Sequence, residues 1–338
     1  MVTAHPRAPA RRMTELIGEI EKRQTTGAFA MQTAARTLRH GLRVARSHAP
    51  SDVLRFLRAA HSAGPYRDRW LCFLEDFART RHLPAPSADL LMKPLNQYMT
   101  AGLSLAERIR LLRMHYGAMT AFAAPQVVRQ LWSSGTFDAG TFRGKSGRYA
   151  LWLCATSVFQ TRKEGEITIA LRDLGSEQTL ARLTFLLAAV EPARPGMMIG
   201  GLQGPKQADA KELIVSATRD LYGLRPRDAV LTAALAIANS IGAREVWAVP
   251  SSMHVHNTRE KRLQKRLFVD YDEVWAERGA RRAWPFGWIF GVPAAPSHSG
   301  KTANGRRRDA VKDAIWSLAR SGFTGEASDW PQIFGQTG

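Results

Sequence analysis

Cysteine is scarce in this chain: only Cys72 and Cys154 occur among 338 residues, and each lies among apolar neighbours. Two such distant cysteines exclude a disulfide framework and favour buried free thiols in a reducing compartment. Long apolar runs are missing too. The candidates 183–190 and 229–241 are too short to cross a bilayer, and no hydrophobic stretch follows the basic residues 1–12, which argues against a secretory signal. We expect a cytoplasmic protein without a transmembrane segment, with peripheral attachment at the inner membrane still open.

Several familiar motifs are also missing. The sequence has neither a phosphate loop of the nucleoside-triphosphatase type nor a dinucleotide fingerprint. Ser251 and Ser252 lie close to His254 but lack a nucleophile elbow around them. His254 and His256 lack a third ligand in register, so no metal site is expected. No helix-turn-helix or zinc finger is visible, which ranks nucleic acid last among the candidate partners.

Positive charge is plentiful. Lys+Arg number 48 against 29 for Asp+Glu, a formal net charge of +19. This balance favours an anionic partner, such as a lipid head group, a phosphorylated small-molecule donor or nucleic acid. The preference for arginine over lysine and the abundance of alanine also fit the translation of a GC-rich genome, so composition alone leaves both explanations open.

The chain changes character near Leu131. Residues 1–13 resemble a disordered basic tail, and residues 14–130 show mostly helical patterns, with Ser104 and Glu107 spaced as a capping box. Residues 131–325 are predicted to form an α/β domain. Its first part contains β-forming runs at 149–160, 166–174 and 180–190, separated by turn signals that include Glu164-Gly165.

A strand, two helices and a further strand follow this meander. Residues 196–202 form a short apolar strand pattern, 209–221 and 229–241 are helical, and 245–249 reads as a strand. Pro226 in the first turn of the second helix is a good start signal. The predicted fold class is α+β or α/β: a helical N-terminal region followed by a mixed, mostly antiparallel sheet flanked by helices.

Several segments, taken in order, match one bacterial family. These segments are His115-Tyr116, Ile199–Gly204, Thr218–Arg227 (TRDLYGLRPR), Ala248–His254, and Asp270–Asp272 with Trp275 and Gly279. The chain resembles the VirK/YbjX family over roughly residues 50–320, most specifically between Gly200 and Val255. The resemblance implies a link to envelope modification, virulence and resistance to cationic peptides, and it implies no particular reaction.

The α/β part is also similar in plan to GNAT acyltransferases. In that fold, backbone N–H groups at a helix start hold the pyrophosphate of acyl-CoA. The corresponding cofactor-binding residues here would be Gly223, Leu224, Arg225 and Arg227. The alternative is an ordinary helix start with surface arginines. The turn lacks the GNAT glycine signature, and Asp228 would repel phosphate.

Candidate acid–base groups follow the strand at 245–249. His254 lies where α/β proteins usually place ligands, and an imidazole could deprotonate an amine or a hydroxyl. Tyr271 and Asp272 are candidates for an acid or a substrate anchor. The alternatives are a hydrogen-bonded structural histidine and a Tyr271–Trp275 pair that only packs on a helix.

A basic stretch follows, and it is the strongest electrostatic feature. Its candidate surface-binding residues are Arg259, Arg262, Lys265 and Arg266. With the nearby tryptophans they fit an anionic lipid surface or single-stranded nucleic acid; a solvated helix face is the third interpretation. The leading functional hypothesis is an acyl-CoA-type acyltransferase acting on an amine or hydroxyl. The alternatives are a non-enzymatic binding protein of an anionic membrane surface, a regulatory binding protein, or a nucleic-acid-binding protein.

Overall fold

The computed structural model describes residues 33–62, 64, 66–191, 194–255, 271–283, 287–298 and 300–323. The predicted basic tail 1–13 and His256 lie outside these residues. So do the candidate surface-binding residues Arg259, Arg262, Lys265 and Arg266.

Helices come first, as predicted. After a helical stretch at 33–45, the elements are α2 Pro50–His61, η1 Tyr66–Leu71, α3 Cys72–Thr80, α4 Ala88–Met92, η2 Lys93–Leu95, α5 Leu105–Phe122 and α6 Pro125–Ser133. The capping box at the start of α5 is present: Ser104 Oγ accepts from Glu107 N, and the Glu107 carboxylate accepts from Ser104 N. The predicted boundary near residue 130 falls inside α6.

Both cysteines are free thiols, but they differ in burial. Cys154 is buried, and burial raises its pKa to about 11, which keeps the thiol protonated and inert. Cys72 is only partly buried, and Arg36 donates to its Sγ at 3.0 Å. The prediction of a buried thiol is therefore right for Cys154 and wrong for Cys72.

The described strands form one sheet in the order β1-β2-β3-β4-β5-β6-β8-β7. Their bounds are β1 Thr136–Arg143, β2 Arg148–Ala155, β3 Ile167–Asp173, β4 Thr179–Glu191, β5 Arg194–Gln203, β6 Glu245–Ala248, β7 Arg281–Ala283 and β8 Gly287–Gly291. Every neighbouring pair is antiparallel except β5 and β6, which run parallel. The sequence prediction of a mixed, mostly antiparallel sheet is confirmed.

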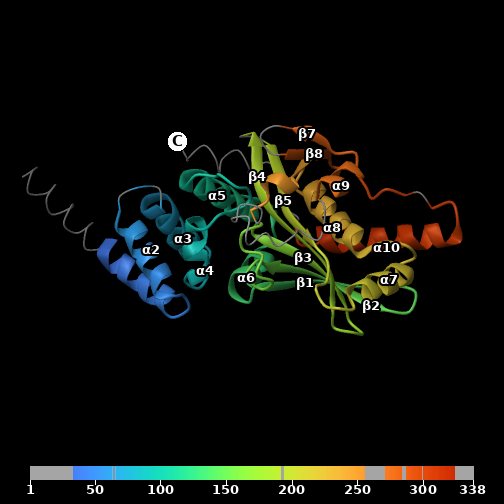
Figure 1. The fold of residues 1–338 in the computed structure, drawn as a ribbon, viewed down its shortest axis with the longest axis horizontal. Helices are drawn as coiled ribbons and strands as arrows, with labels where there is room; N and C mark the ends of the chain where they lie inside the picture. The colour runs from blue at the N-terminus through green and yellow to red at the C-terminus, as the bar shows by residue number, and fades with distance from the viewer. Residues whose placement is uncertain are drawn as a thin grey trace, which may run out of the picture.

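Two helices connect the parallel strands. These are α7 Ala210–Asp220 and α8 Pro226–Ser240, and the remaining elements are η3 Ser251–Met253, α9 Tyr271–Ala276 and α10 Ala303–Arg320. Alanines make α8 slim enough to bury most of its length against the sheet and α10. Figure 1 shows α7, α8 and α10 on one side of the sheet and α2 to α5 on the other. A second cluster of buried residues joins those N-terminal helices to β4, β5, β6 and β8.

Candidate functional site

The parallel strands β5 and β6 part near the middle of the sheet. They pair through Met197 with Val246 and Ile199 with Ala248, and the amide of Val249 donates to Ile199 O at 3.0 Å. Pro250 follows, and a proline has no N–H with which to continue the ladder. Strand β5 runs on to Gln203. Beyond Ile199, its edge on the β6 side is therefore available to side chains.

A bulge in β5 lets a loop approach this region. Ile199 pairs with Phe185 and Gly201 with Thr184, so Gly200 is the extra residue on β5. A Cβ at Gly200 would lie 1.9 Å from the carbonyl oxygen of Glu164, and one at Gly201 would lie 2.1 Å from Glu164 Oε2. Only glycine permits such a close approach. The two glycines lie inside β5, and the loop that joins β2 to β3 packs against them.

Glu164 is buried where the strands part. The side-chain amide of Gln203 donates to both its oxygens, at 2.8 and 2.9 Å. His254 Nε2 lies 4.0 Å from Glu164 Oε1, and the imidazole is fully buried. The structure thus adds Glu164 and Gln203 to the histidine that the sequence singled out.

Tyr271 and His254 come together, with ring centroids 5.1 Å apart. The Tyr271 hydroxyl accepts from the amide of Leu202 at 3.4 Å, so it occupies the β5 edge that β6 leaves. Burial raises the pKa of Tyr271 well above its ordinary value, and the charge of Glu164 adds to this effect. The phenol therefore stays protonated at neutral pH. It also stacks on Trp275, as the alternative prediction expected.

Asp272 has a different set of partners. Its Oδ1 accepts from the amide of Ser251 at 3.2 Å and from Trp288 Nε1 at 2.6 Å. Ser251 Oγ in turn accepts from the amide of Tyr271 at 3.1 Å. These bonds join α9, which carries Tyr271, to the turn before His254. Asp272 therefore helps to hold Tyr271 and His254 next to each other.

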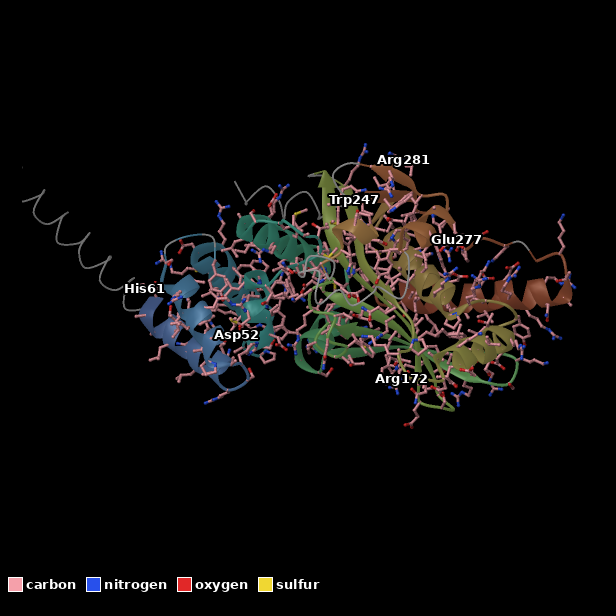
Figure 2. All side chains as sticks on the ribbon, viewed as in Figure 1. Asp52, His61, Arg172, Trp247, Glu277 and Arg281 are labelled. Carbon is pink, nitrogen blue, oxygen red and sulfur yellow. The ribbon has the colours of Figure 1, made fainter. Side chains whose placement is uncertain are left out.

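The predicted cofactor-binding turn lies at the start of α8. Gly223 follows the end of α7 and has a φ of +91°, Leu224 is buried, and Arg225 is the exposed N-cap residue of α8. Arg227 donates to Glu277 at 2.9 Å, and Arg278 pairs with Asp228. Because α7 and α8 connect the parallel strands β5 and β6, the start of α8 lies at the end of the sheet where these two strands have their carboxyl ends. Glu277 is on the α9 side of the molecule, away from the N-terminal helices (Figure 2).

A second buried carboxylate, Glu166, lies two residues further along the same loop. Lys93 Nζ is 2.7 Å from Glu166 Oε1, and the hydroxyls of Tyr98 and Tyr116 donate to its two oxygens at 2.7 and 3.0 Å. Lys93 also donates to Thr156 Oγ1 at 2.8 Å and to the carbonyl of Gly165 at 2.9 Å. The ammonium therefore uses all three of its donors.

Burial and charge shift the pKa values around this pair. Burial lowers the pKa of Lys93, and the charge of Glu166 acts against that change. Burial raises the pKa of Tyr98 and of Tyr116, and Glu166 adds to both shifts. His115 has its pKa lowered to about 3 by burial and by the positive charge of Lys93. The imidazole of His115 is thus neutral at physiological pH.

Sequence reasoning missed both carboxylates. The sequence predicts a turn at Glu164-Gly165, and in the structure Glu164 is only 1% exposed. The overlooked signal is a charged residue inside an apolar stretch: Lys93 follows Leu90, Leu91 and Met92 in the sequence. A charge in such a context is rarely buried without a partner.

The described residues contain no cluster of three or more histidine, cysteine or acidic side chains that could hold a metal ion. In the part of the chain that the structure describes, no helix is long and apolar enough to span a membrane.

Comparisons with known proteins agree with the resemblance found in the motifs. The family described as "Protein of unknown function (DUF535)" matches residues 46–299. The chain is 28% identical over 235 residues to the "Uncharacterized protein YbjX" of Escherichia coli (strain K12), covering 68% of this chain and 70% of that protein. No solved structure matches. The chain therefore belongs to the DUF535 family, and the VirK/YbjX kinship is confirmed.

Proposed function

We propose that this protein is an acyltransferase with a GNAT-like plan, which uses an acyl-CoA-type thioester and an amine or hydroxyl acceptor. The parting of β5 and β6 beyond Ile199 and Ala248 is the observation that carries the proposal. In GNAT folds the acyl donor enters between two such parallel strands. The order of strands and the helices between the parallel pair support the same plan.

The side chains at the parting suit acyl transfer. His254 is the proposed general base, and the nearby Glu164 carboxylate favours the imidazolium that forms. The base takes the proton of the acceptor N–H or O–H as the acceptor attacks the thioester carbonyl carbon. The C–S bond breaks, and Tyr271 gives its proton to the leaving thiolate. The proton on His254 then returns the tyrosinate to a phenol, which balances the cycle.

The start of α8 supplies a charge for the donor's phosphates. Arg225 is exposed and makes no ion pair with the described residues, whereas Arg227 is paired to Glu277. Arg225 is therefore the better placed of the two arginines to bind pyrophosphate, with the helix start beside it. The pairing of Asp228 with Arg278 offsets the repulsion that Asp228 alone would cause.

Thermal unfolding with acetyl-CoA or palmitoyl-CoA tests donor binding. A ligand at 100 times its Kd adds about 2.7 kcal/mol of stability, which raises the Tm by several degrees. Arg225→Ala should reduce this rise, and Arg110→Ala, which removes an exposed arginine from α5, should not. Failure of both thioesters to shift the Tm would contradict the proposal.

Release of free thiol in the presence of primary amines and alcohols tests the chemistry. His254→Ala should keep the Tm rise with acyl-CoA and lower turnover by roughly 10²-fold or more, as expected for loss of a general base. His61→Ala, an exposed histidine of α2, is the matched control. A Tm rise without thiol release from the unaltered protein would favour the non-enzymatic alternative.

The envelope remains the proposed setting, because the family resemblance points to envelope modification. An acceptor from the cell envelope would carry the amine or hydroxyl that the mechanism requires. The alternative function, binding to an anionic membrane surface, depends on Arg259, Arg262, Lys265 and Arg266. It can be tested separately. Charge reversal at Arg262 and Arg266 should reduce sedimentation with anionic liposomes at low salt.

A further inference from the structure

A cavity of about 350 Å³ lies beside Glu166, in the loop that joins β2 to β3. Residues of α4, α5, α6 and the segment around β2 and β3 line it. His254, Tyr271 and the start of α8 are not among the lining residues. The cavity is therefore a different feature from the proposed site of acyl transfer, and the inference drawn from it does not rest on that proposal.

Much of the cavity wall is apolar. Its apolar side chains are Leu90, Met119, Val128, Leu131, Trp132, Ala155, Val158 and Ile167. Ser87, Ser133, Ser134 and Ser157 also line it and are exposed, so the cavity reaches solvent between α4, α6 and the β2–β3 loop. A wall that combines apolar side chains with polar groups is typical of a small-molecule site.

The charged groups in the wall are paired. Asp89 and Arg162 line the cavity and form an ion pair at 2.9 Å. Lys93 lines it too, but its three donors are bonded to Thr156, Gly165 and Glu166. Glu166 keeps room for one more hydrogen bond, since its Oε2 accepts only from Tyr116 among the described residues. Because each charged side chain of the wall already has a partner, a charged ligand would have to compete with these pairs and would lose its hydration.

His115 supplies a donor to the same cavity. Its Nδ1 accepts from the amide of Leu187 at 3.1 Å, so the neutral ring carries its proton on Nε2. Among the residues that the structure describes, no acceptor is bonded to that Nε2. The side chain is only 2% exposed and lines the cavity. A buried donor of this kind is costly unless a ligand or a water accepts from it.

We propose that this cavity binds a neutral, largely apolar small molecule that bears one hydroxyl group. The hydroxyl oxygen accepts from His115 Nε2, and its proton is donated to Glu166 Oε2. The apolar body of the ligand packs against Trp132, Met119 and Leu131. One hydroxyl satisfies the donor and the acceptor together, which neither a hydrocarbon nor a carboxylate does.

Titration with 1-naphthol, 1-naphthoate and naphthalene tests the ligand class, with tryptophan fluorescence or calorimetry as the readout. We expect 1-naphthol to bind at least about tenfold tighter than either of the others, because a tenfold difference corresponds to roughly one good hydrogen bond. Equal or tighter binding of 1-naphthoate would overturn the proposal, and so would equal binding of naphthalene.

Two pairs of variants locate the binding. Leu131→Trp fills the cavity and should abolish 1-naphthol binding, whereas Leu54→Trp makes the same change on an exposed face of α2 and should not. His115→Phe removes the donor and should erase the preference for 1-naphthol over naphthalene. His115→Gln retains a terminal N–H and should keep part of that preference.

Unchanged 1-naphthol binding in Leu131→Trp would overturn the assignment of the cavity. A preference that survives in His115→Phe would overturn the role of His115. No acyl donor is present in these titrations, so their outcome is separate from that of the acyltransferase tests. Circular dichroism of each variant confirms that a loss of binding is not a loss of folding.

Discussion

Glu164 and Glu166 stand two residues apart in one loop, yet their surroundings differ. Glu166 is neutralised by Lys93, which also bonds Thr156 and the carbonyl of Gly165. Glu164 is bonded by the uncharged Gln203 and lies near His254. A carboxylate with a buried countercharge is held by that ion pair, whereas one beside an imidazole can respond to the protonation of that ring. The loop thus joins a structural pair to a candidate reactive one.

The largest expected effect comes from breaking the structural pair. Lys93→Met leaves the Glu166 carboxylate buried without its cation and should lower the free energy of unfolding by about 3–5 kcal/mol. Urea denaturation measures the change. The double variant Lys93→Met/Glu166→Gln should recover more than half of the loss, and a double variant as unstable as the single one would show that the pair is not the cause.

The bulge in β5 should be the next most sensitive feature. Gly200→Ala forces a Cβ against the Glu164 carbonyl, 1.9 Å away before any adjustment, and should cost about 1–3 kcal/mol. Gly204→Ala is the matched control, because its Cβ meets nothing closer than Ile214 Cδ1 at 3.7 Å. Equal stability of the two variants would mean that the β2–β3 loop does not pack closely against Gly200.

His115, which lies near Glu166, should make the stability of the protein depend on pH. Unfolded His115 takes up a proton near pH 6.5, whereas the folded residue does so only near pH 3. Stability is therefore full above pH 6.5 and falls as the pH drops toward 3, by roughly 2 kcal/mol between pH 6.5 and 5. His115→Gln should flatten this part of the profile. His61→Gln, in the exposed part of α2, should leave it unchanged.

The smallest effect is expected at the other carboxylate. Glu164→Gln keeps one acceptor for the Gln203 amide and should cost only about 1 kcal/mol. Glu166→Gln, the same change two residues on, should cost several times more because it leaves Lys93 without its countercharge. If denaturation gives equal losses, the distinction between the two carboxylates is wrong.

Much of the fold was accessible from local patterns. The capping box of α5, the proline at the start of α8 and the strands β2 to β4 depend on neighbours in sequence, and the structure confirms them. Strand β1 is not among the predicted strands. The order of the motifs also identified the family. The sequence predicts a turn at Glu164-Gly165 but gives no sign that this loop folds back onto β5.

Only part of the candidate site could be predicted from the sequence. His254 and Tyr271 were chosen for their chemistry and their place after a strand, and the structure brings them together. Gln203, Lys93 and the two glutamates were missed, because their partners lie 39 or more residues away in the chain. Nothing in the periodicity of a sequence reports contacts over such separations.

The sequence by itself determined the helical N-terminal region, the mixed sheet, the two free thiols and the family, since these follow from local spacing and composition. Only the tertiary structure decided which carboxylate meets Lys93, which one meets Gln203 and His254, and where a cavity opens beside His115. The physical reason is that burial, not residue type, sets the state of an ionisable group, and burial depends on the packing of segments far apart in the chain.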